Sequence, residues 1–391
     1  MARGGRSGGI LVFNAGSSSI KFALFDDAFR RGLSGLADTI GGDGRLNVGG
    51  KERAARFADH ASALDAILEE LGDHGIRLDT LAAVAHRVVH GGRALTKACR
   101  LTAKAIAEIE ACVPLAPLHN PHNLALIRAV SDAAPDLPQY ASFDTAFHAS
   151  NPEVALRYAI PEKEDGKGIR RYGFHGISFA GLTRQLPEIT GHPLPARLLA
   201  FHLGNGVSLC AIRDGCSVAT TMGYSPLDGL TMGTRAGSID GNAVLRLASD
   251  YGIEEATRLL NRESGLRGLG GHSDMRALHA AKTPEAAFAI RHFCYWATRH
   301  AGSMMAAMGG LDALAFTGGI GENDAAIRAA IMDGMAWTGL VARRAGDAEK
   351  GPRLHQSDSS VEAWIVPADE ETTIARDAAA LIASLPAADL A

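Results

Sequence analysis

The sequence lacks the features that mark several large classes of protein. Within its 391 residues there is no run of about 18 uncharged apolar residues, so we expect no transmembrane helix and no membrane partner. The first nine residues are rich in Arg and Gly, and the apolar run after them is broken at Asn14. We therefore expect neither a signal peptide nor a membrane anchor at this end of the sequence.

Paired cysteines and an excess of one charge are also missing. The five cysteines are scattered and form no Cys-x-x-Cys pair, which disfavours a disulfide framework or a zinc module. Such cysteines favour reduced thiols and a cytoplasmic protein. Lys and Arg number 39 against 43 Asp and Glu, a net charge of −4 without a basic stripe, so we expect no nucleic-acid partner.

The remaining composition is that of a globular α/β protein. With 47% hydrophobic residues and about 150 residues per domain, the chain is long enough for two or three domains. Short β-rich runs, such as 10–13, 20–25, 139–143 and 314–316, alternate with helical patterns, such as 284–308 and 370–384. Local signals predict a helix capped by Asn120, a helix over 323–335, a loop over 41–51 and a domain joint over 161–168.

One internal similarity indicates a duplication. Residues 13–26 align without gaps against 201–214, with Phe, Gly, Ala and Asp matching and an offset of 188, about half the chain. Both segments predict a strand, a turn of small residues and a second strand. Two unrelated hairpins would explain this as well; a duplicated fold would let each half offer one turn to a shared cleft.

Three Gly-rich turns favour phosphate binding. Small residues let backbone N–H groups approach an anion closely. The first turn, 15–19, adds three serines and is followed by Lys21, while the second is His202-Leu-Gly-Asn-Gly206. The third, Thr317-Gly-Gly-Ile-Gly-Glu-Asn323, lies between a predicted strand and helix, where a helix N-terminus attracts anions. None has the Walker spacing.

Polar side chains cluster beside these turns. They occur in His86-Arg-Val-Val-His-Gly-Gly92, Phe143-Asp-Thr-Ala-Phe-His148, Arg170-Arg-Tyr-Gly-Phe-His-Gly176 and Met232-Gly-Thr-Arg-Ala-Gly237. Arg, His and Asp at strand ends, next to phosphate-binding turns, indicate an anionic substrate and phosphoryl transfer.

These motifs, in this order and ending with Glu370-Glu371, resemble the acetate kinases, in the superfamily of sugar kinases, actin and the large heat-shock chaperones. The resemblance implies an α/β fold of two duplicated actin-like (ribonuclease H-like) domains, each with a β-β-β-α-β-α core, and a cleft between them. The N-terminal domain would span 1–150 and be closed by a C-terminal helix, 370–391; a nucleotide-binding domain would span 151–369. It further implies reversible, Mg²⁺-dependent transfer of the ATP γ-phosphoryl group to acetate by a homodimer, with Mn²⁺ as an alternative ion.

The resemblance also implies roles for individual residues. Asp144, His175 and Arg235 would be catalytic, Arg87 would bind the substrate carboxylate, and Val89, Leu118 and Pro226 would form a pocket for its methyl group. Asn14 and Glu370 would hold the metal ion. The nucleotide would contact Lys21, His202, Leu203, Gly204, Asn205, Gly206, Asp274, Met275, Arg276, Gly319, Ile320, Gly321, Glu322 and Asn323.

The sequence departs from the usual family pattern near two of these residues. Ala236, Ser238 and Gly241 replace a serine, an aspartate and a proline after Arg235, and Met275 replaces a phenylalanine at the adenine contact. These changes concern substrate and nucleotide preference rather than reaction type. Propionate or butyrate kinase is one alternative function, and a nucleotide-gated binding module of the actin or chaperone type is another.

Overall fold

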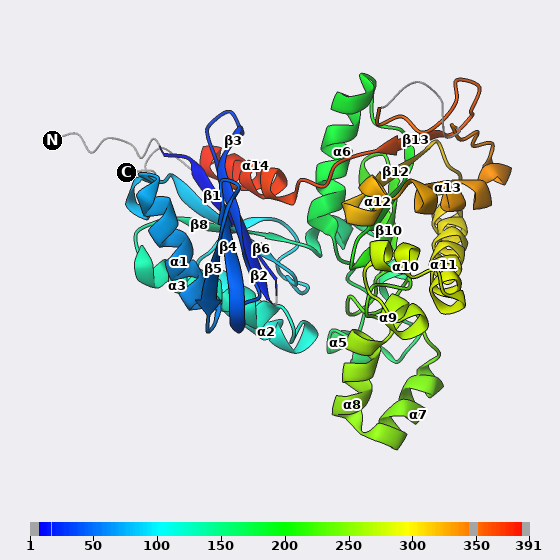
Figure 1. The fold of residues 1–391 in the computed structure, drawn as a ribbon, viewed down its shortest axis with the longest axis horizontal. Coiled ribbons are helices and arrows are strands. Elements are labelled where there is room, and N and C mark those ends of the chain that lie inside the picture. The colour runs from blue at the N-terminus through cyan, green and yellow to red at the C-terminus, as the bar shows by residue number, and fades with distance from the viewer. Residues whose placement is uncertain (1–7, 17, 344–350, 385–391) are drawn as a thin grey trace. The chain divides into compact units, whose positions relative to one another are not determined.

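The computed structural model describes residues 8–16, 18–343 and 351–384. The chain forms two compact units (Figure 1). Unit 1 comprises Met1–Phe147 and Asp369–Ala391, and unit 2 comprises His148–Ala368. The chain therefore passes between the units at 147/148 and at 368/369, whereas the sequence predicted domain ends at 150/151 and 369/370.

Unit 1 is built on a mixed eight-stranded sheet. The strands lie in the order β5 (Lys51–Phe57), β4 (Gly42–Val48), β3 (Arg31–Asp38), β2 (Ser19–Phe25), β1 (Ile10–Ala15), β6 (Ala83–Val88), β8 (Gln139–Phe143) and β7 (Cys99–Arg100). Strands β1, β6 and β8 are parallel to one another, and the remaining neighbours pair antiparallel. Its helices are α1 (His60–Asp73), α2 (Ala103–Ala111), α3 (Asn120–Ala133) and α14 (Glu370–Ala383), with short 3₁₀ helices at Leu78–Thr80 and Val113–Leu115. A further 3₁₀ helix, Ala146–Ser150, contains the 147/148 boundary.

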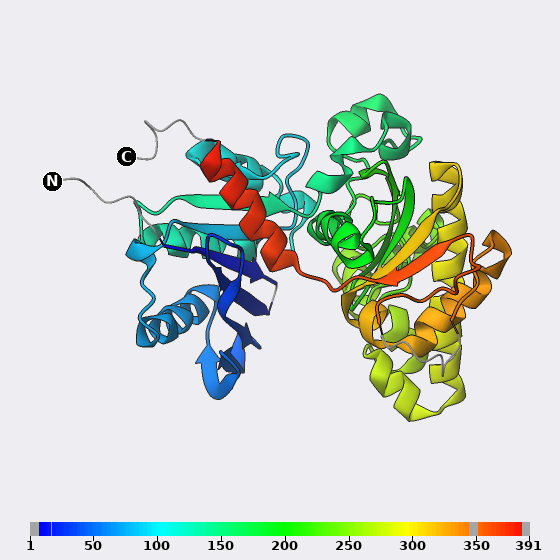
Figure 2. The ribbon, with the colours of Figure 1, turned by 90° about the horizontal axis from the view of Figure 1, so that it is seen from above.

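Helices cover both faces of this sheet, and successive side chains of β1 point to opposite faces. Phe13 is fully buried in a core that includes Leu64 and Ile67 of α1 and Val130 of α3. The neighbouring Asn14 points to the other face, where its side chain meets Glu370 on α14. Figure 2 shows α14, in red, crossing the strands of this unit. Asn14, at the end of β1, therefore lies beside the N-terminal turn of α14.

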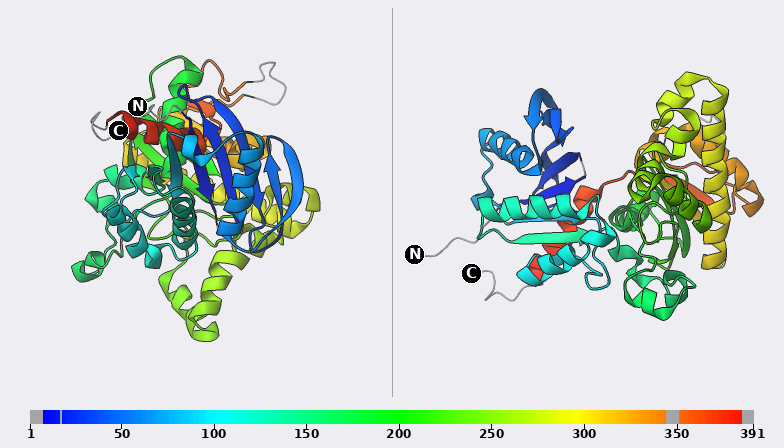
Figure 3. Two further views of the ribbon diagram at one scale, coloured as in Figure 1. Left: turned by 90° about the vertical axis from the view of Figure 1, so that its left-hand side faces the viewer. Right: turned by 90° about the horizontal axis from the view of Figure 1, so that it is seen from below.

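Unit 2 repeats the central part of this topology. Its five strands lie in the order β11 (Cys216–Thr220), β10 (Val207–Arg213), β9 (Arg197–Leu203), β12 (Ala313–Thr317) and β13 (Glu362–Ile365). Strands β9, β12 and β13 are parallel, as β1, β6 and β8 are in unit 1, and β9–β10 is an antiparallel hairpin like β1–β2. Helix α6 (Gly176–Thr190) and the long α11 (Pro284–Met308) cover opposite faces of the sheet (Figures 1 and 3).

The remaining helices of unit 2 are short. They are α4 (Glu153–Leu156), α5 (Glu162–Gly166), α7 (Gly241–Tyr251), α8 (Ile253–Arg258), α9 (Gly265–Gly270), α10 (Met275–Ala281), α12 (Gly318–Asn323) and α13 (Ala325–Gly334), with a π-helical turn at Leu259–Glu263 and a 3₁₀ turn at Ala336–Thr338. None of the helices in the described residues is long and apolar enough to span a bilayer.

The duplicated hairpin is present, but the gapless alignment is wrong in its second half. Phe13 pairs with Phe22 across β1–β2, whereas Phe201 pairs with Leu209, not with the aligned Cys210. The turn after β9 is one residue shorter than the turn after β1. The structural counterpart of Lys21, which pairs with Asn14, is therefore Ser208, which pairs with His202.

Four local predictions also need correction. Residues 41–51 contain β4, whose inward Leu46 and Val48 keep the strand alternation although Gly and Asp surround them. Residues 161–168 lie inside unit 2, where α5 forms and Lys167 pairs with Glu164 at 2.9 Å. Helix α3 has His119 rather than Asn120 at its N-cap. The segment 318–334 is divided into α12 and α13, because the Asp324 side chain caps a new helix by accepting from Ile327 N at 3.1 Å.

Candidate active site

In unit 1, four of the predicted site residues meet at the ends of the central strands. Arg87 on β6 donates from Nε to Asp144 Oδ1 at 3.0 Å and from Nη2 to Asp144 Oδ2 at 2.6 Å. It also donates from Nη1 to Asn14 Oδ1 at 3.1 Å, and Asn14 Nδ2 in turn donates to Glu370 Oε2 at 2.9 Å. Parallel strands bring their carboxyl ends to one sheet edge, which is why residues distant in sequence converge here.

The cluster is buried and has more acidic than basic groups. The Asp144 side chain is 1% exposed and the Arg87 side chain 19% exposed. Burial raises the pKa of Asp144, although the Arg87 charge opposes this. Burial alone would lower the pKa of Arg87, but the carboxylates of Asp144, Glu370 and Glu371 raise it. Arg87 is therefore a permanent cation, and its donors are shared between the Asp144 carboxylate and the Asn14 amide oxygen.

The turn after β1 lies next to this cluster. Lys21 stands directly opposite Asn14 in the β1–β2 ladder, and such pairs share a face of the sheet. Asn123 of α3 fixes the turn, because its amide donates to Ala15 O and accepts from Val89 N, both at 3.1 Å. Ser17, one of the three serines of the turn, lies outside the described residues.

In unit 2, two predicted imidazoles form a stacked pair. His175 and His202 lie with ring centroids 4.1 Å apart. Each ring is fixed through Nδ1, that of His175 by Ser208 Oγ at 2.8 Å and that of His202 by Ser178 Oγ at 2.9 Å. His175 has φ +59°, a left-handed conformation that is uncommon for a residue with a side chain, and it is the N-cap of α6. The surrounding structure must therefore hold it.

Arg235 converges with His175 on one point in space. A methyl group placed on Gly206 would lie 2.8 Å from Arg235 Nη2 and 3.0 Å from His175 Nε2. Burial lowers the pKa of Arg235 to about 10. Its Nη1 donates to Pro226 O at 2.7 Å, and none of the ion pairs among the described residues includes it. A partly buried cation without an acidic partner is an expensive arrangement that an anion would relieve.

A cavity of about 920 Å³ adjoins this point. It is lined by Gly204, Asn205, Ser273, Asp274, Met275, Arg276, His279, Gly319, Ile320, Asn323, Asp324, Ala325 and Ala326. The loop that carries Arg235 rests on the same wall, because Gly233 N donates to Asn205 O at 3.0 Å. Eight of the residues predicted to contact the nucleotide therefore line one cavity, and Arg235 lies on a loop that contacts its wall.

Six of the fourteen predicted nucleotide contacts do not line this cavity. Lys21 belongs to unit 1, and His202 and Gly206 lie at the stacked pair and the point described above. Leu203 is fully buried in the sheet, and Gly321 is buried in α12, close to Leu203 and Phe316. Glu322 joins two backbone segments, because its Oε1 accepts from Gly318 N at 3.0 Å and from Ala368 N at 2.9 Å.

The three residues predicted to contact the methyl group differ in their surroundings. Val89 is buried in unit 1, at the end of β6, and Leu118 is 37% exposed in the same unit. Pro226 belongs to unit 2, where it is partly buried and its carbonyl holds Arg235.

Residues that the sequence interpretation missed complete both clusters. Glu371 accepts from Asn14 at 3.2 Å, and it was visible in the sequence only as a neighbour of Glu370. Ser178, Ser208 and Asn123 each orient a predicted residue through one hydrogen bond. The gapless alignment hid Ser208, because it matched this serine with the apolar Ile20.

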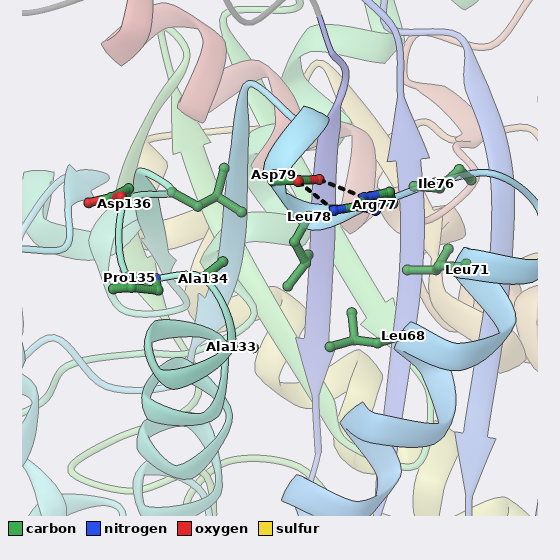
Figure 4. A pocket seen from close by; sticks show the side chains of 12 residues that line it. Leu68, Leu71, Ile76, Arg77, Leu78, Asp79, Ala133, Ala134, Pro135 and Asp136 are labelled. Atoms are coloured by element: carbon green, nitrogen blue, oxygen red, sulfur yellow. Dashed lines mark hydrogen bonds and ion pairs between the residues drawn. The ribbon is translucent and has the colours of Figure 1, made fainter.

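A second cavity, of about 450 Å³, lies in unit 1 where the ends of α1 and α3 meet (Figure 4). Leucine, isoleucine, alanine and proline residues form most of it, and the exposed pair Arg77–Asp79, at 2.8 Å, lies at its edge. None of the predicted site residues lines it, so we assign no chemistry to it.

The fold and the two clusters together define a class of protein. A duplicated α/β core, a Gly-lined cavity, and an arginine and an imidazole that converge beside it are typical of a nucleotide-dependent kinase with an actin-like fold. The chain belongs to the acetokinase family, whose family model matches residues 9–376. The family and the fold class predicted from the sequence are thus confirmed.

Individual relatives agree with this assignment over nearly the full length. An acetate kinase of Deinococcus deserti is 44% identical over 96% of this chain and 98% of its own. The crystal structure of Porphyromonas gingivalis acetate kinase has a TM-score of 0.87 and 33% identity, and it covers 96% of this chain and 100% of its own. A propionate kinase structure from Francisella tularensis has a TM-score of 0.89 and 36% identity, and it covers 95% and 98%.

Proposed function

We propose that this protein transfers the γ-phosphoryl group of ATP to acetate, giving acetyl phosphate and ADP, by direct in-line displacement in a reversible reaction. The convergence of Arg235 and His175 beside Gly206, next to the nucleotide cavity, is the observation that carries this proposal. In phosphoryl transfer, negative charge on the transferring group must be offset while donor and acceptor are held in line. Two cationic or hydrogen-bonding groups at one point provide such an offset.

The acceptor carboxylate needs no general base. A carboxylic acid with a pKa near 4 to 5 is already ionised at pH 7, so no proton has to be removed before attack. Asp144 is poorly placed for that work, because both of its oxygens accept from Arg87. We assign Asp144 the role of orienting Arg87, and Arg87 the role of binding the acceptor carboxylate.

The oxygen-rich cluster of unit 1 suits a magnesium ion. Asn14, Asp144, Glu370 and Glu371 offer hard oxygen donors within one hydrogen-bond network. No group of three or more His, Cys, Asp or Glu in the described part of the chain is arranged to hold a metal by itself. This fits Mg²⁺, which commonly takes one or two carboxylates and completes its shell with water and substrate phosphates. Asn14 and Glu370 would hold the ion, which would neutralise phosphate charge; Mn²⁺ would suit the same oxygens.

The substrate is tested by measuring acyl phosphate directly. Purified protein is incubated with ATP, Mg²⁺ and acetate, and hydroxylamine traps acetyl phosphate as the hydroxamate. Hydroxamate in amounts matching the ADP released is expected, and ATP hydrolysis without hydroxamate would rule the proposal out. Omission of Mg²⁺ and replacement of acetate by a non-carboxylate anion are the controls.

Propionate is the second candidate acceptor, because the propionate kinase structure is about as similar to this chain as the acetate kinase structure. One extra methylene changes discrimination in an apolar pocket by about 1–3 kcal/mol. We expect kcat/KM to fall from acetate to propionate to butyrate, and the same assay across the three acids measures this order. We further place the enzyme in the cytoplasm, where ATP and reduced thiols occur, and propose that it acts as a homodimer.

A further inference from the structure

His148 lies in a buried polar chain directly beneath His175. Its Nε2 is 2.9 Å from Phe174 O, and its Nδ1 is 2.9 Å from Ser217 Oγ. Ser217 Oγ is in turn 3.2 Å from Cys210 Sγ. His148, Ser217 and Cys210 are all fully buried in unit 2.

The proton positions in this chain follow from the partners. A carbonyl oxygen only accepts, so His148 must carry a proton on Nε2 to bond Phe174. Burial lowers the pKa of His148 to about 4, so the ring is neutral near pH 7 and its Nδ1 is an acceptor. Ser217 therefore donates to Nδ1, and the Cys210 thiol has two acceptors within reach, Ser217 Oγ at 3.2 Å and Ala211 O at 3.8 Å. The protons in the chain therefore point one way, from Ser217 to His148 and from His148 to the Phe174 carbonyl.

The Phe174 carbonyl belongs to the peptide bond that leads into His175. Gly173 on its other side has φ +77°, and a methyl group at Gly173 would lie 2.6 Å from His148 Cδ2. His148 thus contacts the strained turn 173–175 both through its ring and through its Nε2 proton. The left-handed His175 that follows has a side chain only 3.0 Å from the point it shares with Arg235.

We propose that His148 is a positioning residue for phosphoryl transfer, which holds the left-handed His175 in place by donating Nε2–H to Phe174 O. This proposal rests on the proposed role of His175 in phosphoryl transfer. It adds that His148 fixes the backbone on which His175 is carried. His148 is not among the residues that line the cavity. Its ring also meets Phe179 of α6 edge-on, with centroids 5.8 Å apart, so the variants below are chosen to single out the Nε2–H bond. Its loss should lower kcat and leave nucleotide binding unchanged.

The first test compares three single variants with wild type. His148→Leu removes the donor at similar volume, and His148→Gln places an amide N–H near the position of Nε2. Cys210→Ala is the matched control, since it perturbs the far end of the same buried chain and leaves the Phe174 bond intact. We expect kcat of His148→Leu to fall about 10- to 100-fold with the KM for ATP within two-fold of wild type, in the range for a displaced catalytic group. Gln should recover most of the loss, and Cys210→Ala should stay within two-fold.

The second test asks whether His148 acts through His175. In a double-mutant cycle, His148→Leu should cost less than two-fold in a His175→Ala background, because residues that act through one another are not additive. An equal loss in both backgrounds, or a His148→Gln variant as slow as His148→Leu, would overturn the proposal. So would a His148→Leu variant that keeps more than a third of wild-type kcat.

A third measurement needs no variant activity. In wild-type protein labelled with ¹⁵N-histidine, the His148 resonances, assigned by their absence in His148→Gln, should report the neutral Nε2–H tautomer. An Nδ1–H tautomer would overturn the proposal even if the His148→Leu chain failed to fold. This result is independent of acetyl phosphate formation, so a failure of the proposed function and a failure of the His148 role are distinguishable.

Discussion

Replacing Arg235 by Ala should separate catalysis from stability. Arg235 is partly buried, donates Nη1 to Pro226 O and directs Nη2 to the point shared with His175. We expect kcat to fall roughly 10³-fold, about 4 kcal/mol, with little change in the KM for ATP. This magnitude is that of arginines which act on a transferring phosphoryl group, and it corresponds to the loss of one or two hydrogen bonds to a charged group.

The same variant should not lose stability. The pKa of Arg235 is lowered by burial from 12.5 to about 10, so the charged form is disfavoured in the fold by about 3 kcal/mol at any pH below 10. The hydrogen bond to Pro226 O opposes this with about 1.5–3 kcal/mol. The two effects nearly cancel, so the free energy of unfolding should change by no more than about 1 kcal/mol. A purely structural arginine would instead lower it.

The assay is steady-state acetyl phosphate formation at saturating Mg²⁺, with urea unfolding on the same samples. Arg246→Ala is the matched control, because Arg246 on α7 is exposed and pairs only with Asp250, at 2.7 Å, among the described ion pairs. Its kcat should equal that of wild type. If Arg235→Ala kept more than a tenth of wild-type kcat, the role given to Arg235 would be untenable.

Three further substitutions or comparisons follow from the same contacts. Arg87→Ala should raise the acetate KM at least tenfold with a smaller loss in kcat, and an unchanged KM would contradict this. It should also lower the free energy of unfolding by about 3–5 kcal/mol, since Asp144 is left buried without its partner. Gly206→Ala should lower kcat about 100-fold, because its methyl group would enter the point between Arg235 and His175, and steady-state kinetics showing wild-type kcat would remove that point from the mechanism. Met275 is buried in the wall of the nucleotide cavity, and its side chain is flexible and has no ring face. The ratio of kcat/KM for ATP to that for GTP should therefore be less than about 10³, or about 4 kcal/mol, and a larger ratio would refute the idea of relaxed selectivity.

Much of the fold could be predicted from the sequence because the strongest signals are local. The apolar strands 10–13 and 139–143 and the long helix Pro284–Met308 are where the pattern places them. Strand β4 was missed because its glycines and aspartate read as a turn, although tertiary pairing with β3 and β5 decides its structure. Asn120 was read as a cap, yet its amide is used to hold His90, with Nδ2 3.0 Å from His90 O.

The candidate site was harder to predict where one element acts on another. Their positions at strand ends identified Arg87 and Asp144 as site residues. The sequence did not show that Arg87 would occupy both oxygens of Asp144 and so leave it unsuited to act as a base. The positioning residues Ser208 and His148 are as fully buried as core apolar residues, and both lie far from His175 in sequence. Only the hairpin register and the turn at 173–175 bring them to it. His148 and this turn both lie in motifs noted in the sequence, but no local motif shows that the two meet.

Buried histidines should make this protein sensitive to acid. Burial lowers the pKa of His86, His90 and His148 from 6.5 to about 4. Below pH 6.5 the unfolded chain therefore binds protons that the folded chain does not, so stability falls as the pH drops and continues to fall until about pH 4. At pH 5 each histidine should remove about 2 kcal/mol, a large total against the 5–15 kcal/mol of a typical protein. Asp144 acts in the opposite sense, because its raised pKa lets the folded chain take up a proton, and it offsets only part of the loss. Urea unfolding at pH 7 and pH 5 measures the balance, and we expect His86→Leu to flatten the dependence, since His86 Nδ1 is buried without a hydrogen-bond partner among the described residues. Equal free energies of unfolding at the two pH values would show that these rings gain protons while folded, which their burial should forbid.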